Sequence, residues 1–249
     1  MKKLIFKNFK KKKSAFTLAE VLITLGIIGV VAALTLPNLM SAYKAHTLKT
    51  QFMKANSTLQ QVFRLMQADD LSLDPSDYPR ISNDDQLQDF YKIFFNYLSG
   101  ATDCGAFTRS DKKGCFNANK DEERTKEYKT LDGKKGVDYF FFDDGQILLS
   151  NGTLLLFEHP NGGIGGASHI WIFADINGAN NPPNRLGYDL FAFQFLEGGI
   201  RPMGAEGTEF TNIDTTCDIN GTSKWNGITC TVKAISDPDY FKRITKSIK

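Results

Sequence analysis

Residues 10–39 read KKKKSAFTLAEVLITLGIIGVVAALTLPNL, and this stretch decides how the chain begins. From Ala15 to Met40 every residue is apolar, small or uncharged except Glu20. A charged side chain at the centre of a membrane-spanning helix costs about 3 kcal/mol even on lenient insertion scales. A lone carboxylate in such a run is therefore a functional hypothesis by default, and it needs a partner.

The apolar run is long enough to cross a bilayer. As one helix, Phe16 to Met40 measures about 37 Å at about 1.5 Å per residue, against a hydrocarbon core of about 30 Å. Lysines flank only its N-terminal side, which holds that side in the cytoplasm and sends everything after Met40 across the membrane. We expect a single-pass protein with an extracytoplasmic head. A cleaved secretory signal is the other interpretation of such a start.

The charge of the chain is unevenly distributed. Residues 1–15 contain seven lysines and no acid, so the formal net charge of +2 hides a body with 23 basic and 28 acidic side chains. Phosphate recognition needs clustered Lys and Arg. A mildly acidic body disfavours direct binding of nucleic acid, and 41% hydrophobic residues are enough to build a core.

The segment Ser14–Glu20, SAFTLAE, stands between a lysine block and an unbroken apolar helix that contains Pro37. It resembles the class III leader of type IV pilins and type II secretion pseudopilins. The resemblance implies that a prepilin peptidase cuts between Ala15 and Phe16 and methylates the new amine. It also implies other pilin or pseudopilin subunits as partners. The family usually has Gly where this chain has Ala15, so we expect cleavage that is tolerated or slower.

The resemblance gives Glu20 a role in assembly. In such filaments the Glu of one subunit is thought to neutralise the amino terminus of its neighbour, here Phe16. An amine and a carboxylate within hydrogen-bonding reach compensate one another in a low dielectric, where each alone is heavily penalised. The alternative is that Glu20 lies at headgroup depth near the helix start, where the helix dipole favours a carboxylate.

The sequence divides into a leader (1–15), a transmembrane and assembly helix (16–40), an amphipathic continuation of that helix (41–68) and a head (69–249). The continuation carries apolar residues at alternating intervals of four and three, which is typical of a helix that packs on a core. These are Leu48, Phe52, Ala55, Leu59, Val62 and Met66. This is the long helix that the pilin architecture places on a sheet.

The head reads as α+β, with a second helix predicted from Asn83 or Asp84 to Ser99. Apolar runs separated by turn residues predict strands of an antiparallel meander. They are 137–142 (VDYFFF), 147–150 (ILLS), 153–157 (TLLLF), 170–175 (IWIFAD) and 189–195 (DLFAFQF). The predicted fold is a pilin-like α+β protein, with a long N-terminal helix packed on an antiparallel sheet.

Four cysteines in an extracytoplasmic head favour disulfides. Three pairings are possible, and we favour the two local ones, Cys104 with Cys115 and Cys217 with Cys230, because each pair flanks a polar turn that contains glycine. A zinc site would need the closer CxxC type of spacing, which the chain lacks.

The segment 175–189 supports a metal hypothesis. Asp175, Asn177, Asn180 and Asp189 offer oxygens to Ca²⁺, and some pseudopilins use a calcium-binding loop in this part of the head. The spacing is not that of an EF-hand, because Leu186 stands where the twelfth residue would be Glu. A tight turn in which Asn and Asp bond the backbone is the alternative.

No catalytic motif is present: the sequence has no GxSxG, HExxH or Walker-type phosphate loop, so we expect no enzyme. The predicted function is that of a structural subunit of a type IV pilus-like or type II secretion pseudopilus filament. An anchored or secreted adhesin without a role in a filament is the alternative.

Overall fold

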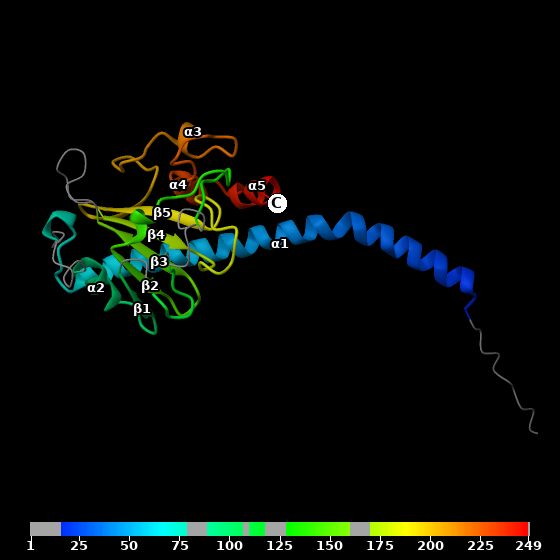
Figure 1. Ribbon diagram of the computed structural model, residues 1–249, viewed down its shortest axis with the longest axis horizontal. Coiled ribbons are helices and arrows are strands. Elements are labelled where there is room, and N and C mark those ends of the chain that lie inside the picture. The colour runs from blue at the N-terminus through cyan, green and yellow to red at the C-terminus, as the bar shows by residue number, and fades with distance from the viewer. Residues whose placement is uncertain (1–15, 79–88, 107–109, 118–127, 160–169, 249) are drawn as a thin grey trace, which may run out of the picture. The chain divides into compact units, whose positions relative to one another are not determined.

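The computed structural model describes residues 16–78, 89–106, 110–117, 128–159 and 170–248. The predicted leader, 1–15, lies outside the described residues. The chain forms two compact units, Met1–Ser41 and Ala42–Lys249, and helix α1 (Leu18–Ala68) contributes to both. Each unit is described by itself (Figure 1).

The first unit consists of the apolar part of α1. Pro37 lies inside the helix, and the large apolar side chains before Ser41 are exposed, from Leu18 at 78% to Met40 at 69%. The most apolar 18-residue window of α1 has a mean hydropathy of 2.3, and none of it is buried by protein. By length and composition, α1 is able to cross a membrane.

The second unit is built on a six-stranded antiparallel sheet whose strand order follows the chain, β1 to β6. The strands are β1 (Thr102–Gly105), β2 (Gly145–Leu148), β3 (Leu154–Glu158), β4 (Ile170–Asp175), β5 (Leu190–Leu196) and β6 (Gly199–Pro202). Short connections such as Asn151-Gly152, between β2 and β3, keep sequential strands adjacent. The antiparallel meander is confirmed.

The second part of α1 packs against one face of this sheet (Figure 1). All six residues of the predicted apolar stripe are buried there, which confirms the α+β, pilin-like architecture. Strand β5 shows the alternation that this layering needs, because Phe191 and Phe193 share the core with α1 while Leu190 and Ala192 face a second core. Burial on both faces explains why the central strands read as continuous apolar runs.

Three further helices pack on the same face as α1, namely α2 (Asp89–Phe95), α4 (Cys230–Ser236) and α5 (Tyr240–Ser247), while α3 (Ile213–Thr216) lies in the connection after β6. Helix α2 places Tyr91 over Gly145, where a Cβ atom would lie 2.4 Å from the ring. The opposite face is covered by loop segments that contribute Phe116, Tyr128, Phe142, Met203 and Ile228.

One predicted strand is wrong, because residues 139–142 form a 3-10 helix, Tyr139–Phe142. Asp138 begins it by accepting a hydrogen bond from the Phe140 amide at 3.2 Å. A strand would point Phe140 and Phe142 to one face, yet Phe142 is buried and Phe140 is 56% exposed. The turn points the rings in different directions, so Phe142 packs in the core against Phe173, while Phe140 stacks on Tyr139 and stays exposed.

The second predicted helix is present in shortened form. It spans Asp89–Phe95 in the described part of the chain and gives way to turns before Gly100. The predicted start at Asn83 or Asp84 lies outside the described residues.

Replacing Phe52 by Ala tests the packing of α1 on the sheet. Phe52 is fully buried, with its ring centroid 4.5 Å from that of Phe191 and 5.5 Å from that of Phe241. We expect Phe52→Ala to lower the unfolding free energy by about 3–5 kcal/mol, measured by denaturant unfolding of the full chain in detergent. Met53→Ala is the matched control, because Met53 is 44% exposed. Equal effects of the two changes would contradict this packing.

Candidate assembly site and features of the head

The candidate assembly site is the N-terminus of α1, where Glu20 bonds to Thr17. The Glu20 Oε2 atom accepts hydrogen bonds from the backbone N–H and from the hydroxyl of Thr17, both at 2.8 Å. In return the Thr17 hydroxyl oxygen accepts a bond from the Glu20 N–H at 3.2 Å. This reciprocal pair is a capping box, which satisfies backbone donors that the first turn of a helix leaves free.

The capping box explains why α1 begins at Leu18. It also determines which oxygen of the Glu20 carboxylate is left for other hydrogen-bond partners. Both bonds from Thr17 end on Oε2, so within the described residues Oε1 accepts no hydrogen bond. Both Thr17 and Glu20 are exposed, as is Phe16 at 86%. The carboxylate thus retains one oxygen directed at no described group, next to the position where cleavage would create an amine.

The prediction from sequence named Glu20 but omitted Thr17. The signal was present, because Thr followed three residues later by Glu before an apolar run is the pattern of a capping box. Of the predicted processing residues, Phe16 directly precedes this box, while Ala15 lies outside the described residues.

Comparison with protein families adds an independent finding for this region. Residues 10–36 match the prokaryotic N-terminal methylation motif. The chain carries the signature of type IV pilins and pseudopilins. The match covers the lysine block, the capping box and the apolar part of α1 up to Leu36. No curated protein and no solved structure matches the chain.

The head beyond this pilin signature contains two disulfides, Cys104–Cys115 and Cys217–Cys230. They are the two local pairings expected from the sequence. The first ties β1 to the loop after it, and the second ties the residue after α3 to the first residue of α4. Closing loops of this size removes freedom from the unfolded chain and stabilises the fold by roughly 3 kcal/mol each.

The segment from Asp175 to Asp189 brings together two buried carboxylates. Asp175 Oδ1 accepts bonds from the backbone N–H of Asn177 and Gly178, at 3.3 and 2.9 Å, and its Oδ2 accepts the Tyr128 hydroxyl at 2.7 Å. Asp189 accepts the backbone N–H groups of residues 184 and 185. Carboxylates that bond the backbone in this way are what the turn interpretation predicts.

Burial raises the pKa of both carboxylates. Burial, reinforced by the charge of Asp189, raises the pKa of Asp175 to about 7, against the opposing effect of its hydrogen bonds. Burial likewise raises the pKa of Asp189 to about 6, while bonds from the backbone of Arg185 and Asn184 lower it. Desolvation disfavours the charged form of each acid, and two neighbouring charges disfavour one another.

The calcium hypothesis for this loop stays a prediction. Asn177 lies near the two carboxylates, and Asn180 lies on the surface of the loop. Sequence reasoning omitted Asn184, whose amide oxygen is buried and accepts no hydrogen bond from a described residue, as is true of the Asn177 amide oxygen. Amide and carboxylate oxygens are ligands that Ca²⁺ takes in proteins.

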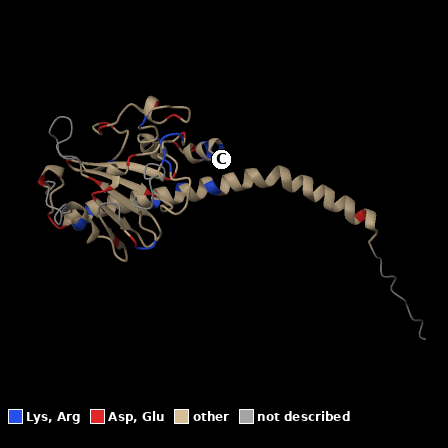
Figure 2. Cartoon of the chain, viewed as in Figure 1, with Lys and Arg blue, Asp and Glu red and all other residues tan. Residues whose placement is uncertain are grey.

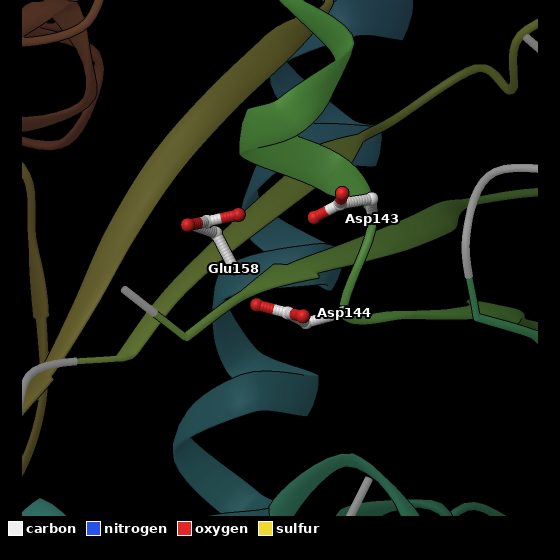
Figure 3. A group of neighbouring side chains, drawn as sticks. All are labelled: Asp143, Asp144 and Glu158. Carbon is white, nitrogen blue, oxygen red and sulfur yellow. The ribbon is translucent and has the colours of Figure 1, made fainter. Parts of the chain in front are cut away.

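A second group of acids was not predicted from the sequence. Asp143, Asp144 and Glu158 come from the turn into β2 and the end of β3, and their carboxylates lie within 4.8 Å of one another (Figure 3). The backbone N–H of His159 donates to Asp144 at 2.7 Å. Asp143 and Asp144 are adjacent in sequence, and the pairing of β2 with β3 brings Glu158 to them. Their oxygens suit a hard cation, although Ca²⁺ takes six to eight ligands, so the group alone does not assign a metal.

The pKa values of the Asp175 loop predict a pH dependence of stability. A carboxylate whose pKa is higher in the folded than in the unfolded state holds its proton better when folded. The contribution of Asp175 to the unfolding free energy is therefore greatest below about pH 4, and it falls as the pH rises towards 7. We expect Asp175→Asn to match the native chain at about pH 3.5 and to exceed its unfolding free energy by about 2–4 kcal/mol near pH 7.5.

The measurement is denaturant unfolding at both pH values in the presence of a chelator. Glu197→Gln, which removes an exposed acid, is the control and should track the native chain at each pH. A constant offset of Asp175→Asn across the pH range would contradict the raised pKa.

Millimolar Ca²⁺ at the higher pH should raise the melting temperature of the native chain more than that of Asp175→Asn if the loop binds the ion. No rise in the native chain would refute the calcium prediction.

Proposed function

We propose that this protein is a structural subunit of a type IV pilus-like or type II secretion pseudopilus filament, processed between Ala15 and Phe16 and assembled through α1. The observation that carries the proposal is an exposed apolar helix with a single carboxylate at its start, inside the methylation motif. Exposed apolar surface of this extent requires lipid or other helices to cover it. A membrane covers it before assembly, and neighbouring copies of such helices cover it afterwards.

The capping box sets the geometry of this assembly. Cleavage before Phe16 creates a cationic amine four residues from Glu20 in the same chain. When the amine of one subunit meets the Glu20 Oε1 atom of a parallel neighbour, the two helices are offset by four residues. This offset is about 6 Å along the axis at about 1.5 Å per residue, before the reach of the side chain is added. The pair neutralises both charges in a dry helix bundle and fixes the axial register.

The alternative, an anchored or secreted adhesin, shares the membrane helix but not the processing. It leaves the carboxylate only its role in the helix cap, and it predicts an intact or differently cut N-terminus. Partners under the proposal are a prepilin peptidase and other pilin or pseudopilin subunits. The acidic body supports no direct role in binding nucleic acid.

Mass spectrometry of the N-terminal peptide from native membranes tests the processing. We expect a methylated Phe16 terminus, because only a prepilin peptidase cuts before the apolar run and modifies the new amine. A chain that keeps its lysines, or one cut after the apolar run, would favour the adhesin instead.

Glu20→Gln separates the two roles of this residue, because Gln still serves a capping box but carries no charge. We expect the variant to insert and to be cleaved, while its recovery in sheared filaments falls roughly tenfold or more, since a buried amine is left uncompensated. Thr17→Ala is the comparison variant, because it removes the Thr17 side chain from the cap and keeps the carboxylate, and its recovery in filaments should fall less than that of Glu20→Gln. Incorporation of Glu20→Gln at the native level would contradict the pairing.

A further inference from the structure

Cations of the second unit gather around the residues of α1 with which this unit begins. From Val21 to Ala68 the helix contains no acidic residue, and its first cations after Met40 are Lys44 and Lys49. Both are exposed. Along one continuous helix they lie four and nine residues beyond Met40, which is about 6 and 14 Å at about 1.5 Å per residue.

Helix α5 adds three cations to this end of the unit. Its start is fixed to α1 by a hydrogen bond from the Lys49 ammonium to the Pro238 carbonyl, at 3.3 Å, and by the contact of Phe241 with Phe52. The buried face of α5 consists of Tyr240, Phe241, Ile244 and Thr245. Its other face is exposed and carries Lys242, Arg243 and Lys246. Figure 2 shows blue segments on α1 and on α5 at this end of the unit.

We call Lys44, Lys49, Lys242, Arg243 and Lys246 the basic patch. Two acids reduce its charge, because Asp239 pairs with Lys242 at 2.8 Å and Asp237 pairs with Arg243. The other three are not paired with an acid among the described residues, although Lys49 donates to the Pro238 carbonyl and Lys44 lies 5.2 Å from the centre of the Tyr188 ring. The rest of the body is acidic overall, so the patch is a local reversal of sign.

Tyr43 gives a second and independent indication of what the patch faces. Its ring is 73% exposed and stands three residues after Met40. Aromatic residues with a polar tip are enriched at both ends of membrane-spanning helices, where the ring lies at the level of the headgroups. No core contact explains an exposed ring here, whereas a membrane interface does.

We propose that the basic patch binds the anionic phospholipid headgroups of the bilayer that holds the apolar segment. The Debye length at physiological salt is about 8 Å, so cations a few residues from the end of the segment act on the membrane surface. Each Lys or Arg near an anionic surface strengthens binding roughly fivefold. The patch therefore holds the head against the membrane while the subunit is stored there. This inference rests on the membrane anchoring within the proposed function and not on filament assembly.

Amine labelling of the full chain in vesicles tests this inference. The chain is reconstituted in phosphatidylcholine alone or with phosphatidylglycerol, treated with an uncharged amine-acetylating reagent, and digested for mass spectrometry. We expect labelling of Lys242 and Lys246 to slow roughly fivefold in the anionic vesicles and to recover in high salt. Lys92 on α2 and the exposed Lys113 are internal controls, because they lie outside the patch, and their rates should be the same in both vesicles.

The variant Lys246→Gln supplies a second readout, since the side chain is exposed and the change leaves the core intact. Protection of Lys242 should fall in this variant. Equal labelling of Lys242 in the two vesicles overturns the proposal, as does protection of Lys92 to the same extent. A chain that does not float with vesicles overturns both this inference and the anchoring. Floating without protection overturns this inference alone, whatever the outcome for filaments.

Discussion

The exposed apolar side chains between Phe16 and Met40 are the constraint on which the rest of the structure depends. The same continuous helix buries Leu48 and Phe52 against a sheet, so α1 must satisfy two environments with one backbone. It does so by changing its pattern after Ser41, from apolar on all sides to an apolar stripe with cations between. The head is the partner that this stripe requires, and the membrane or a bundle of similar helices is the partner that the first part requires.

The distribution of charge follows from this division. A leader of seven lysines stands on one side of the apolar segment, and the cations of α1 and α5 stand on the other. By the positive-inside rule, the seven lysines of the leader predict that their side of the segment stays in the cytoplasm. Under the proposed function, removal of the leader leaves Glu20 and the new amine as the charges at that end.

The fold could be predicted where the pattern was long and strongly periodic. The predictions of the α1 stripe and of the central strands were correct, because burial on one or both faces gives a clear apolar pattern in the sequence. Short helices were missed: α4 has seven residues and α5 has eight, which is less than the length over which helical periodicity is usually read, although the buried Tyr240, Phe241 and Ile244 of α5 do follow helical spacing. The strand predicted over the aromatic residues 139–142 was wrong for a different reason, because ring packing in several directions overrode their β propensity. Sites made by strand pairing, such as Asp144 with Glu158, leave no local signal at all.

Under the proposed function, the capping role and the assembly role of Glu20 are compatible, because they use different oxygens at different times. In the single chain the capping box satisfies Oε2 and the free N–H groups of the first turn, so the carboxylate is stabilised before any neighbour arrives. The cap also restricts the side chain, which lowers the entropy lost when Oε1 later accepts an amine. A carboxylate left flexible would have to be ordered during assembly in a medium that penalises every misplaced charge. Glu20, in the first turn of α1, is for this reason well suited to the role in setting register that the proposed function gives it.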